Sequence, residues 1–319
     1  MAETATTHTG NGRAPEAPTH LSKSTWKGTL RRTVKEFRED DLTLLAAALT
    51  YYGILALFPA LLVLVSLVGL AGKDTIDTLL NNVGDLAPGA TRDVITNAVH
   101  NLQNSNSAAG VAFIAGLAAA LWSASGYVGA FTKAANVIYE VEEGRKFWKL
   151  KPIQIFATLV VVLLTAIVVI AVVVTGPVAE KVGSVIGLGD TAVTVFGIVK
   201  WPVIALIVSQ IFAFLYWITP NVKQPGFKWI SPGGVLAVVL WIAASALFAF
   251  YVGNFGSYSK TYGSMAAAII FLVWLWITNV VMLLGLEFNA ETERGRQIEA
   301  GHDPEVEPFL PHREEPKPS

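Results

Sequence analysis

The most constraining feature of the sequence is a long run without charge. The 31 positions from Leu42 to Gly72 contain no Asp, Glu, Lys or Arg. About 20 apolar residues in a helix are enough to cross the hydrocarbon core of a bilayer. An acidic pair, Asp40 and Asp41, lies directly before the run. The run therefore predicts a transmembrane helix, and the other apolar segments must pack against it or lie in lipid.

The remaining chain has the composition of a polytopic membrane protein. It is 53% hydrophobic and only 15% charged, whereas soluble domains average about 25% charged residues. A helix satisfies its own backbone hydrogen bonds, so it is the form that an apolar segment takes in lipid. We predict an all-α bundle of six transmembrane helices with interfacial amphipathic helices, and the expected spans are about 42–70, 108–131, 153–175, 194–218, 230–253 and 265–287.

Basic residues set the expected orientation of these spans. Eighteen of the 23 lysines and arginines lie on the side that holds both ends of the chain, and five lie on the other. Basic residues gather on the cytoplasmic side of a membrane. We therefore expect a multi-pass protein of the bacterial plasma (inner) membrane with both termini in the cytoplasm.

The segments outside the spans differ in character. Residues 1–25 and 296–319 are polar and predict a disordered cytoplasmic arm and a disordered cytoplasmic tail, with the membrane domain at 26–295 between them. Residues 26–39 combine a narrow apolar face with basic residues, which predicts a helix in the headgroup region or a solvated linker helix. Two short amphipathic helices are expected within 73–107, over the outer mouth of the bundle, and a third within 176–190.

Several classes of chemistry are disfavoured. The net charge of −1 argues against a nucleic-acid partner. The chain has no cysteine, and none of its five histidines falls in an apolar run, so no metal site is expected in the membrane. No glycine-rich phosphate loop, acidic relay in mid-span or cluster of nuclease ligands is present. We expect no cofactor and no enzymatic activity.

The first span supplies three candidate residues. Thr50 and Tyr51 offer hydroxyls to a bundle interior, whereas Tyr52 is more typical of an interface anchor. Pro59 frees the carbonyl of Leu55 and predicts a kink, which could form a hinge or cavity wall or a static bend set by packing.

The second span carries small residues at helical spacing. The stripe includes Ser123 and Gly126 and predicts a close helix contact; Ser125 is a further candidate beside it. Asn136 follows near the cytoplasmic end, and a buried amide there must find partners, because an unpaired one costs about 1–3 kcal/mol. We expect Asn136 to fix one helix against another.

The last span ends at a carboxylate. Glu287 could cap the bundle in a pair with Arg145 or Lys133, or could be a solvated helix-end charge. Asn279 lies two turns earlier and could face the same interior.

Several of these stretches together resemble one family. The first span reads AALTYY and then ALFP, the second LWSASG followed by ANVIY, and the last YGS followed by LGLEFNA. This pattern is similar to the YihY/BrkB family of bacterial inner-membrane proteins, over about residues 30–295. Members once carried the label ribonuclease BN, others are called virulence or serum-resistance factors, and the family is generally treated as transporters without an agreed substrate.

The resemblance and the polar but uncharged candidates imply the same function. We expect a transporter or flippase-like protein that handles an amphiphilic or lipid-linked envelope molecule, with membrane lipids and a lipid-like or small-molecule substrate as partners. The alternative is a scaffold or envelope-integrity factor that recruits partners through its tails and residues 132–152. A membrane ribonuclease is the least favoured reading, and the oligomeric state is open.

Overall fold

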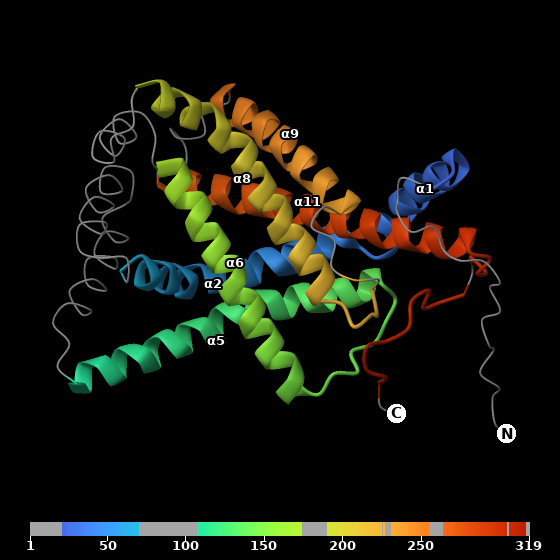
Figure 1. The fold of residues 1–319 in the computed structure, drawn as a ribbon, viewed down its shortest axis with the longest axis horizontal. Helices are drawn as coiled ribbons and strands as arrows, with labels where there is room; N and C mark the ends of the chain where they lie inside the picture. The colour runs from blue at the N-terminus through green and yellow to red at the C-terminus, as the bar shows by residue number, and fades with distance from the viewer. Residues whose placement is uncertain are drawn as a thin grey trace. The chain divides into compact units, whose positions relative to one another are not determined.

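The fold is all-helical (Figure 1). The computed structural model describes residues 21–69, 107–173, 190–224, 226, 231–254, 264–304 and 306–316. Its helices are α1 (Lys23–Glu39), α2 (Leu42–Gly69), α5 (Ser107–Ile138), α6 (Phe147–Val173), α8 (Asp190–Ile218), α9 (Pro232–Asn254) and α11 (Ser264–Glu299). Within these residues, five helices are long and apolar enough to cross a membrane, and the bent pair α1–α2 brings the number to six. The predicted all-α polytopic architecture is confirmed.

Helix ends differ from the predicted spans mainly on the charged side. Helix α5 continues past residue 131 to Ile138, and α11 continues past Glu287 to Glu299. Ion pairs between residues three apart, Glu291–Arg294 and Glu293–Arg296, support this extension of α11 beyond its apolar part. The amphipathic helices expected within 73–107 and 176–190 fall on residues 73–106 and 176–189, outside the described residues.

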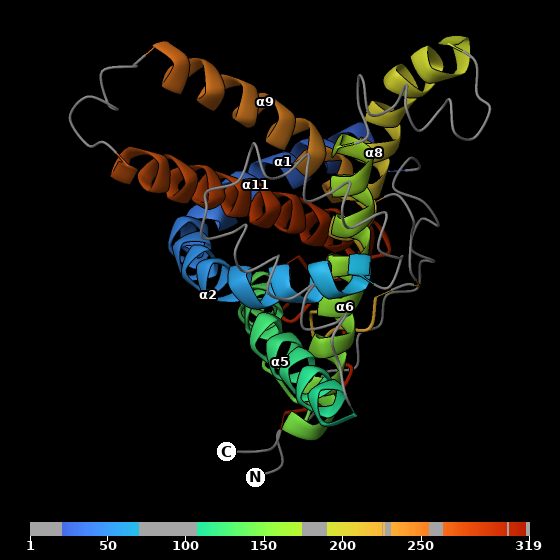
Figure 2. The same ribbon diagram turned by 90° about the vertical axis from the view of Figure 1, so that its left-hand side faces the viewer.

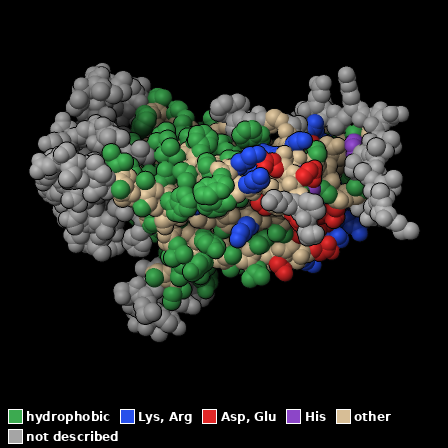
Figure 3. Space-filling view, turned by 90° about the horizontal axis from the view of Figure 1, so that it is seen from below, with side chains coloured by type: hydrophobic (Ala, Val, Ile, Leu, Met, Phe, Trp, Pro, Cys, Tyr) green, Lys and Arg blue, Asp and Glu red, His purple; other side chains and the backbone are tan. Residues whose placement is uncertain are grey.

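Contacts divide the chain into two compact units. Unit 1 comprises Met1–Thr50, Ala130–Phe147 and Phe212–Ser319, and unit 2 comprises Tyr51–Gly129 and Trp148–Ile211. Figure 3 shows hydrophobic side chains over much of one face and charged side chains gathered in a separate region of it.

In unit 1, helices α9 and α11 run side by side (Figures 1 and 2). A Cβ at Gly233 would lie 2.0 Å from the carbonyl oxygen of Gly285, and a Cβ at Gly285 would lie 2.7 Å from that of Gly233. Only glycine at both positions permits this backbone contact. The Tyr216 hydroxyl then attaches α8 to α11 by donating a hydrogen bond of 2.6 Å to the carbonyl of Met282.

Residues at the start of two helices follow well-known capping rules. The Ser22 hydroxyl accepts a hydrogen bond from the Thr25 amide at the start of α1, and Ser231 does the same for Gly234 at the start of α9. Pro232 occupies the first position of α9, where its missing N–H costs nothing. Both helices therefore begin where the local sequence sets them.

Helix α1 packs on the charged extension of α11. Thr29 and Thr33 are buried on this side, and the Trp26 ring stacks on Phe288 at 5.9 Å. Of the other three residues in the predicted apolar face, Leu30 and Val34 are exposed and Phe37 is half-buried. The chain then bends by 64° into α2 at a turn that contains Asp41.

In unit 2, the described packing is smaller and mostly apolar. Val63, Ala120 and Val162 form a buried cluster from α2, α5 and α6. The Lys151 ammonium lies 4.5 Å from the centre of the Trp122 ring and donates a 2.6 Å hydrogen bond to the Ser125 hydroxyl. These contacts join α5 to α6 without a salt bridge.

Candidate functional site

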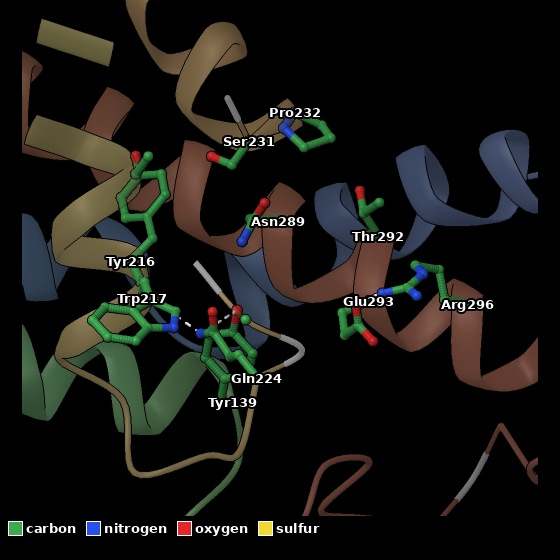
Figure 4. A pocket seen from close by; sticks show the side chains of 12 residues that line it. Tyr139, Tyr216, Trp217, Gln224, Ser231, Pro232, Asn289, Thr292, Glu293 and Arg296 are labelled. Atoms are coloured by element: carbon green, nitrogen blue, oxygen red, sulfur yellow. Dashed lines mark hydrogen bonds and ion pairs between the residues drawn. The ribbon is translucent and has the colours of Figure 1, made fainter. Parts of the chain in front are cut away.

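The candidate site is a pocket where several helix ends meet in unit 1 (Figure 4). Its cavity volume is about 50 Å³, within a hollow of about 530 Å³ that includes open solvent. Helices α8, α9 and α11, the segment after α8, and Tyr139 directly after α5 all contribute. The side chains that line it are mainly aromatic or polar: Tyr139, Ala213, Tyr216, Trp217, Gln224, Ser231, Pro232, Asn289, Thr292, Glu293 and Arg296.

Polar contacts hold the pocket walls in place. Gln224 donates to the Tyr139 hydroxyl at 3.2 Å and to the Tyr216 carbonyl at 2.8 Å, so it joins the ends of α5 and α8. On the opposite side, Arg296 and Glu293 form an ion pair of 2.6 Å. The pocket thus presents aromatic rings, amides and hydroxyls with a balanced charge, which suits a small polar group bound by hydrogen bonds and stacking.

Residues 306–316, here called the C-terminal strap, lie over the ends of α5 and α8. Arg313 donates hydrogen bonds to the carbonyls of Trp217, Ile218 and Val222, and its guanidinium lies 5.5 Å from the centre of the Trp217 ring. The strap therefore caps the end of α8, whose last carbonyls have no partner within the helix.

A second part of the strap braces the other aromatic wall. Phe309 stacks on Tyr139 at 5.8 Å. A Cβ at Gly144 would lie 1.9 Å from the carbonyl oxygen of Glu314, so the strap passes directly over this glycine. The expected disorder of residues 296–319 is thus corrected: its first residues are helical and 306–316 are packed. The polar, Pro-rich composition of this segment predicted disorder. The segment is instead held by backbone and arginine hydrogen bonds, which apolar periodicity does not reveal.

Asn136 joins the end of α5 to the segment after α8. Its carbonyl oxygen accepts a 2.8 Å hydrogen bond from the Asn221 amide, and its NH₂ donates to Glu143 at 2.9 Å. Glu143 also binds Arg145 at 2.6 Å, and Arg145 donates to the Thr219 carbonyl at 2.6 Å. Burial opposes ionisation of Glu143, but hydrogen bonds from Arg145 and Asn136 outweigh it and lower its pKa.

Glu287 lies deep in the charged end of unit 1. Its side chain is 1% exposed, and no described residue donates a hydrogen bond to its Oε2 atom. The expected pairing with Arg145 is wrong, because Arg145 is occupied by Glu143, and Lys133 is exposed. A solvated helix-end charge is also excluded by the burial.

Other carboxyl groups gather nearby. Glu291 is buried and pairs with Arg32 and Arg294. Burial and the negative charge of Glu36 raise the pKa of Asp40 to about 7. Burial and a hydrogen bond with Glu307 raise the pKa of Glu140 to about 8. This end of unit 1 therefore holds carboxyl groups that retain protons near neutral pH.

The structure brings two of the predicted residues together. The Asn279 NH₂ donates a 3.1 Å hydrogen bond to the Thr50 hydroxyl, and both side chains are buried. Tyr51, expected in the interior, is instead 63% exposed, since consecutive side chains of a helix point about 100° apart and Thr50 takes the buried direction. Tyr52 is also exposed, and its ring meets that of Tyr51 edge to face. Helix α2 runs through Pro59 without ending.

The small-residue stripe of the second span does not make the expected helix contact. Ser123 is exposed, and a Cβ at Gly126 would meet nothing within 4 Å. Ser125 is buried and holds Lys151 as described above. The sequence pattern correctly identified a helix face made of small side chains. It could not show whether another helix of this chain packs against that face.

None of the candidate residues from the sequence lines the pocket. Its walls come from helix ends and a connecting segment, where spacing gives little signal. Asn289 and Thr292 could have been noticed, because they interrupt the apolar pattern just beyond Glu287. No group of three or more potential metal-ligating His, Cys, Asp or Glu side chains occurs in the described part of the chain.

Comparison with known proteins places these features in a family. The family model described as "Virulence factor BrkB" matches residues 33–309. A Bacillus subtilis protein named "Putative ribonuclease-like protein YfkH" is 30% identical over 79% of this chain and 90% of its own length. A "UPF0761 membrane protein" of Alkalilimnicola ehrlichii is 31% identical over 80% of this chain, which spans only 56% of that protein. No solved structure matches the chain.

Proposed function

Because this chain belongs to the BrkB family of integral membrane proteins, we propose that it is a transporter or flippase-like protein for an amphiphilic or lipid-linked envelope molecule. The proposal includes a place in the bacterial inner membrane with both termini in the cytoplasm, supported by the distribution of lysine and arginine. No enzymatic step is part of it.

The observation that carries the proposal is the pocket beside an exposed apolar helix face. Pro232 lines the pocket and begins α9. From there, large apolar side chains are exposed along one side of α9, at Val235, Val239, Ile242 and Phe250. Their spacing of three, four or eight residues places them on one helix face. A lipid whose polar headgroup lies in the pocket would thus have its acyl chains beside the exposed apolar face of α9.

The chemistry of the pocket indicates the kind of head that fits. Trp217 and Tyr139 offer faces for stacking or for a cation, and Asn289, Thr292 and Gln224 offer hydrogen-bonding groups. The Glu293–Arg296 pair can exchange its internal contact for contacts with a zwitterionic group. Such a site favours a polar headgroup of balanced charge over a strongly anionic one.

A reconstitution assay tests the proposal. Protein in vesicles with fluorescent headgroup-labelled phospholipids should speed their passage between leaflets, and Thr292→Val should slow this passage about tenfold. The matched control is Thr158→Val in unit 2. Each threonine is buried and donates its hydroxyl to the carbonyl four residues earlier, at 2.7 Å, but only Thr292 lines the pocket. Equal rates in vesicles with and without protein, for lipid and lipid-linked probes alike, would refute the function.

The scaffold alternative meets a specific difficulty. Asn221 joins the expected recruiting segments within unit 1, because it donates hydrogen bonds to the carbonyl of Glu142, in the loop after α5, and to that of Glu314, in the tail. A partner would first have to displace the C-terminal strap. No observation in the described residues favours the ribonuclease alternative.

A further inference from the structure

The strongest unassigned feature of the molecule is the isolation of the Glu287 carboxyl group. The Glu287 residue is only 1% exposed, and its Oε2 atom has no donor among the described residues. A carboxylate removed from water without a donor or a cation is heavily penalised, whereas a protonated carboxyl is penalised far less.

The surrounding charges increase this penalty. The strongest charge interactions on Glu287 come from four other carboxyl groups: Asp40, Glu291, Glu36 and Glu140. Glu36 belongs to α1, Asp40 to the turn after it, Glu140 to the loop after α5, and Glu291 to α11 itself. Like charges at close range favour the neutral form of the group between them.

The two arginines of this region, Arg32 and Arg294, form ion pairs with other carboxyl groups. Arg32 pairs with Glu291, and Arg294 binds Glu291 at 3.4 Å, Glu307 at 3.0 Å and Glu140 at 3.6 Å. Helix α9 and the unit 1 part of α2 contribute no Asp, Glu, Lys, Arg or His, and Lys133 on α5 is exposed. Among the described residues, no lysine, arginine or histidine forms an ion pair with Glu287.

We infer that Glu287 is a proton-binding site, in which a proton rather than a cationic side chain or a metal ion neutralises the buried carboxylate. Metal binding is the weaker alternative, because the described residues form no cluster of three ligands there.

A polar line connects this site to the apolar part of α11. Arg294, Glu291, Glu287 and Asn279 follow one another at intervals of three, four and eight residues, so they share one helix face. Asn279 and its partner Thr50 lie about 12 Å from Glu287 along the helix axis, at 1.5 Å per residue. A proton held at Glu287 thus lies between the charged end of unit 1 and a polar pair inside the span.

This placement gives the proton a role in the proposed transport. Uptake of the proton would remove a buried charge and stabilise the closed packing of unit 1, and release of the proton would favour its opening. This role rests on the proposed function, whereas proton binding itself does not.

Infrared spectroscopy of the whole protein tests the binding site directly. At about pH 9, Asp40 and Glu140 are largely ionised, since their pKa values are about 7 and about 8. We expect the absorption of a protonated carboxyl to persist at this pH, to vanish in Glu287→Gln and to remain in Glu143→Gln, whose wild-type carboxylate is held ionised by Arg145. Absence of the band in the wild type, or its survival in Glu287→Gln, would overturn the inference.

Two further measurements complete the test. If Glu287→Gln does not fold, Glu287→Asp should shift the band, and an unshifted band would count against the site. In vesicles, lipid passage should vary with pH in the wild type and lose this dependence in Glu287→Gln. If the wild type shows the carboxyl band but no lipid passage, the proposed function is refuted and the proton site stands. If it shows lipid passage but no carboxyl band, the proton site is refuted and the proposed function stands.

Discussion

The two units of this protein are both made of apolar helices, but different interactions hold each of them together. Unit 1 relies on close backbone contacts at glycine, on buried arginines and on the C-terminal strap. The described part of unit 2 relies on a small apolar cluster and one lysine over a tryptophan ring. Apolar surface alone specifies little in lipid, since lipid chains are as apolar as the side chains they meet. The specific contacts of unit 1 should therefore make it the more sensitive unit to substitution.

The largest effect should come from the buried arginine of unit 1. Arg145→Met removes the buried guanidinium that pairs with Glu143 and donates to the Thr219 carbonyl, and we expect unfolding in mixed micelles to become easier by about 3 kcal/mol. In unit 2, Lys151→Met removes a ring contact and a hydrogen bond at a partly exposed site, and the cost should be about 0–1 kcal/mol. Equal losses would remove the contrast between the units.

A glycine pair sharpens the same contrast. Gly233→Ala forces a methyl group into the backbone of α11, and overpacking of this kind costs about 1–3 kcal/mol or more. Gly126→Ala places its methyl group where nothing lies within 4 Å, so its effect should stay within about 0.5 kcal/mol. Thermal unfolding of the two purified variants against the wild type measures both.

The effect of pH should be specific to unit 1. A carboxyl whose pKa is raised on folding contributes stability at low pH and loses it as the pH rises to the folded value. The contribution of Glu140 should therefore fall between about pH 4.5 and about pH 8, and that of Asp40 between about pH 4 and about pH 7. Glu140→Gln cannot ionise and should flatten the unfolding temperature over this range. An unchanged slope would show that Glu140 does not titrate there.

The smallest effect should come from a single hydroxyl. Thr50→Val removes the acceptor for Asn279, and a hydrogen bond between membrane helices is worth about 0.6 kcal/mol. Thr158→Val in unit 2 removes a hydroxyl that bonds only to its own helix among the contacts described, so unfolding should change less. A larger loss for Thr158 than for Thr50 would contradict the account of α2 and α11.

The sequence predicted the helices well because charge-free runs are long and membranes permit few backbone forms. It also located Asn136, since a buried amide must find partners. It failed where contacts come from chain segments without periodicity. The disorder of the tail was wrong for this reason, and Gln224 in the pocket gave no signal by spacing. The interior position of Tyr51 and the pairing of Glu287 with Arg145 were wrong because the sequence does not show which side of a helix is covered or which partner an arginine takes.

The C-terminal strap has a consequence for biosynthesis. Residues 306–316 follow all the described helices in the sequence, yet Arg313 completes the end of α8 and Glu314 lies over Gly144. During translation, α5 and α8 are synthesised before residues 306–316 and must wait with these groups uncovered. Docking of the strap is then a late step of folding, and a ribosome that stalls just beyond α11 would leave the described helices around an unfinished pocket.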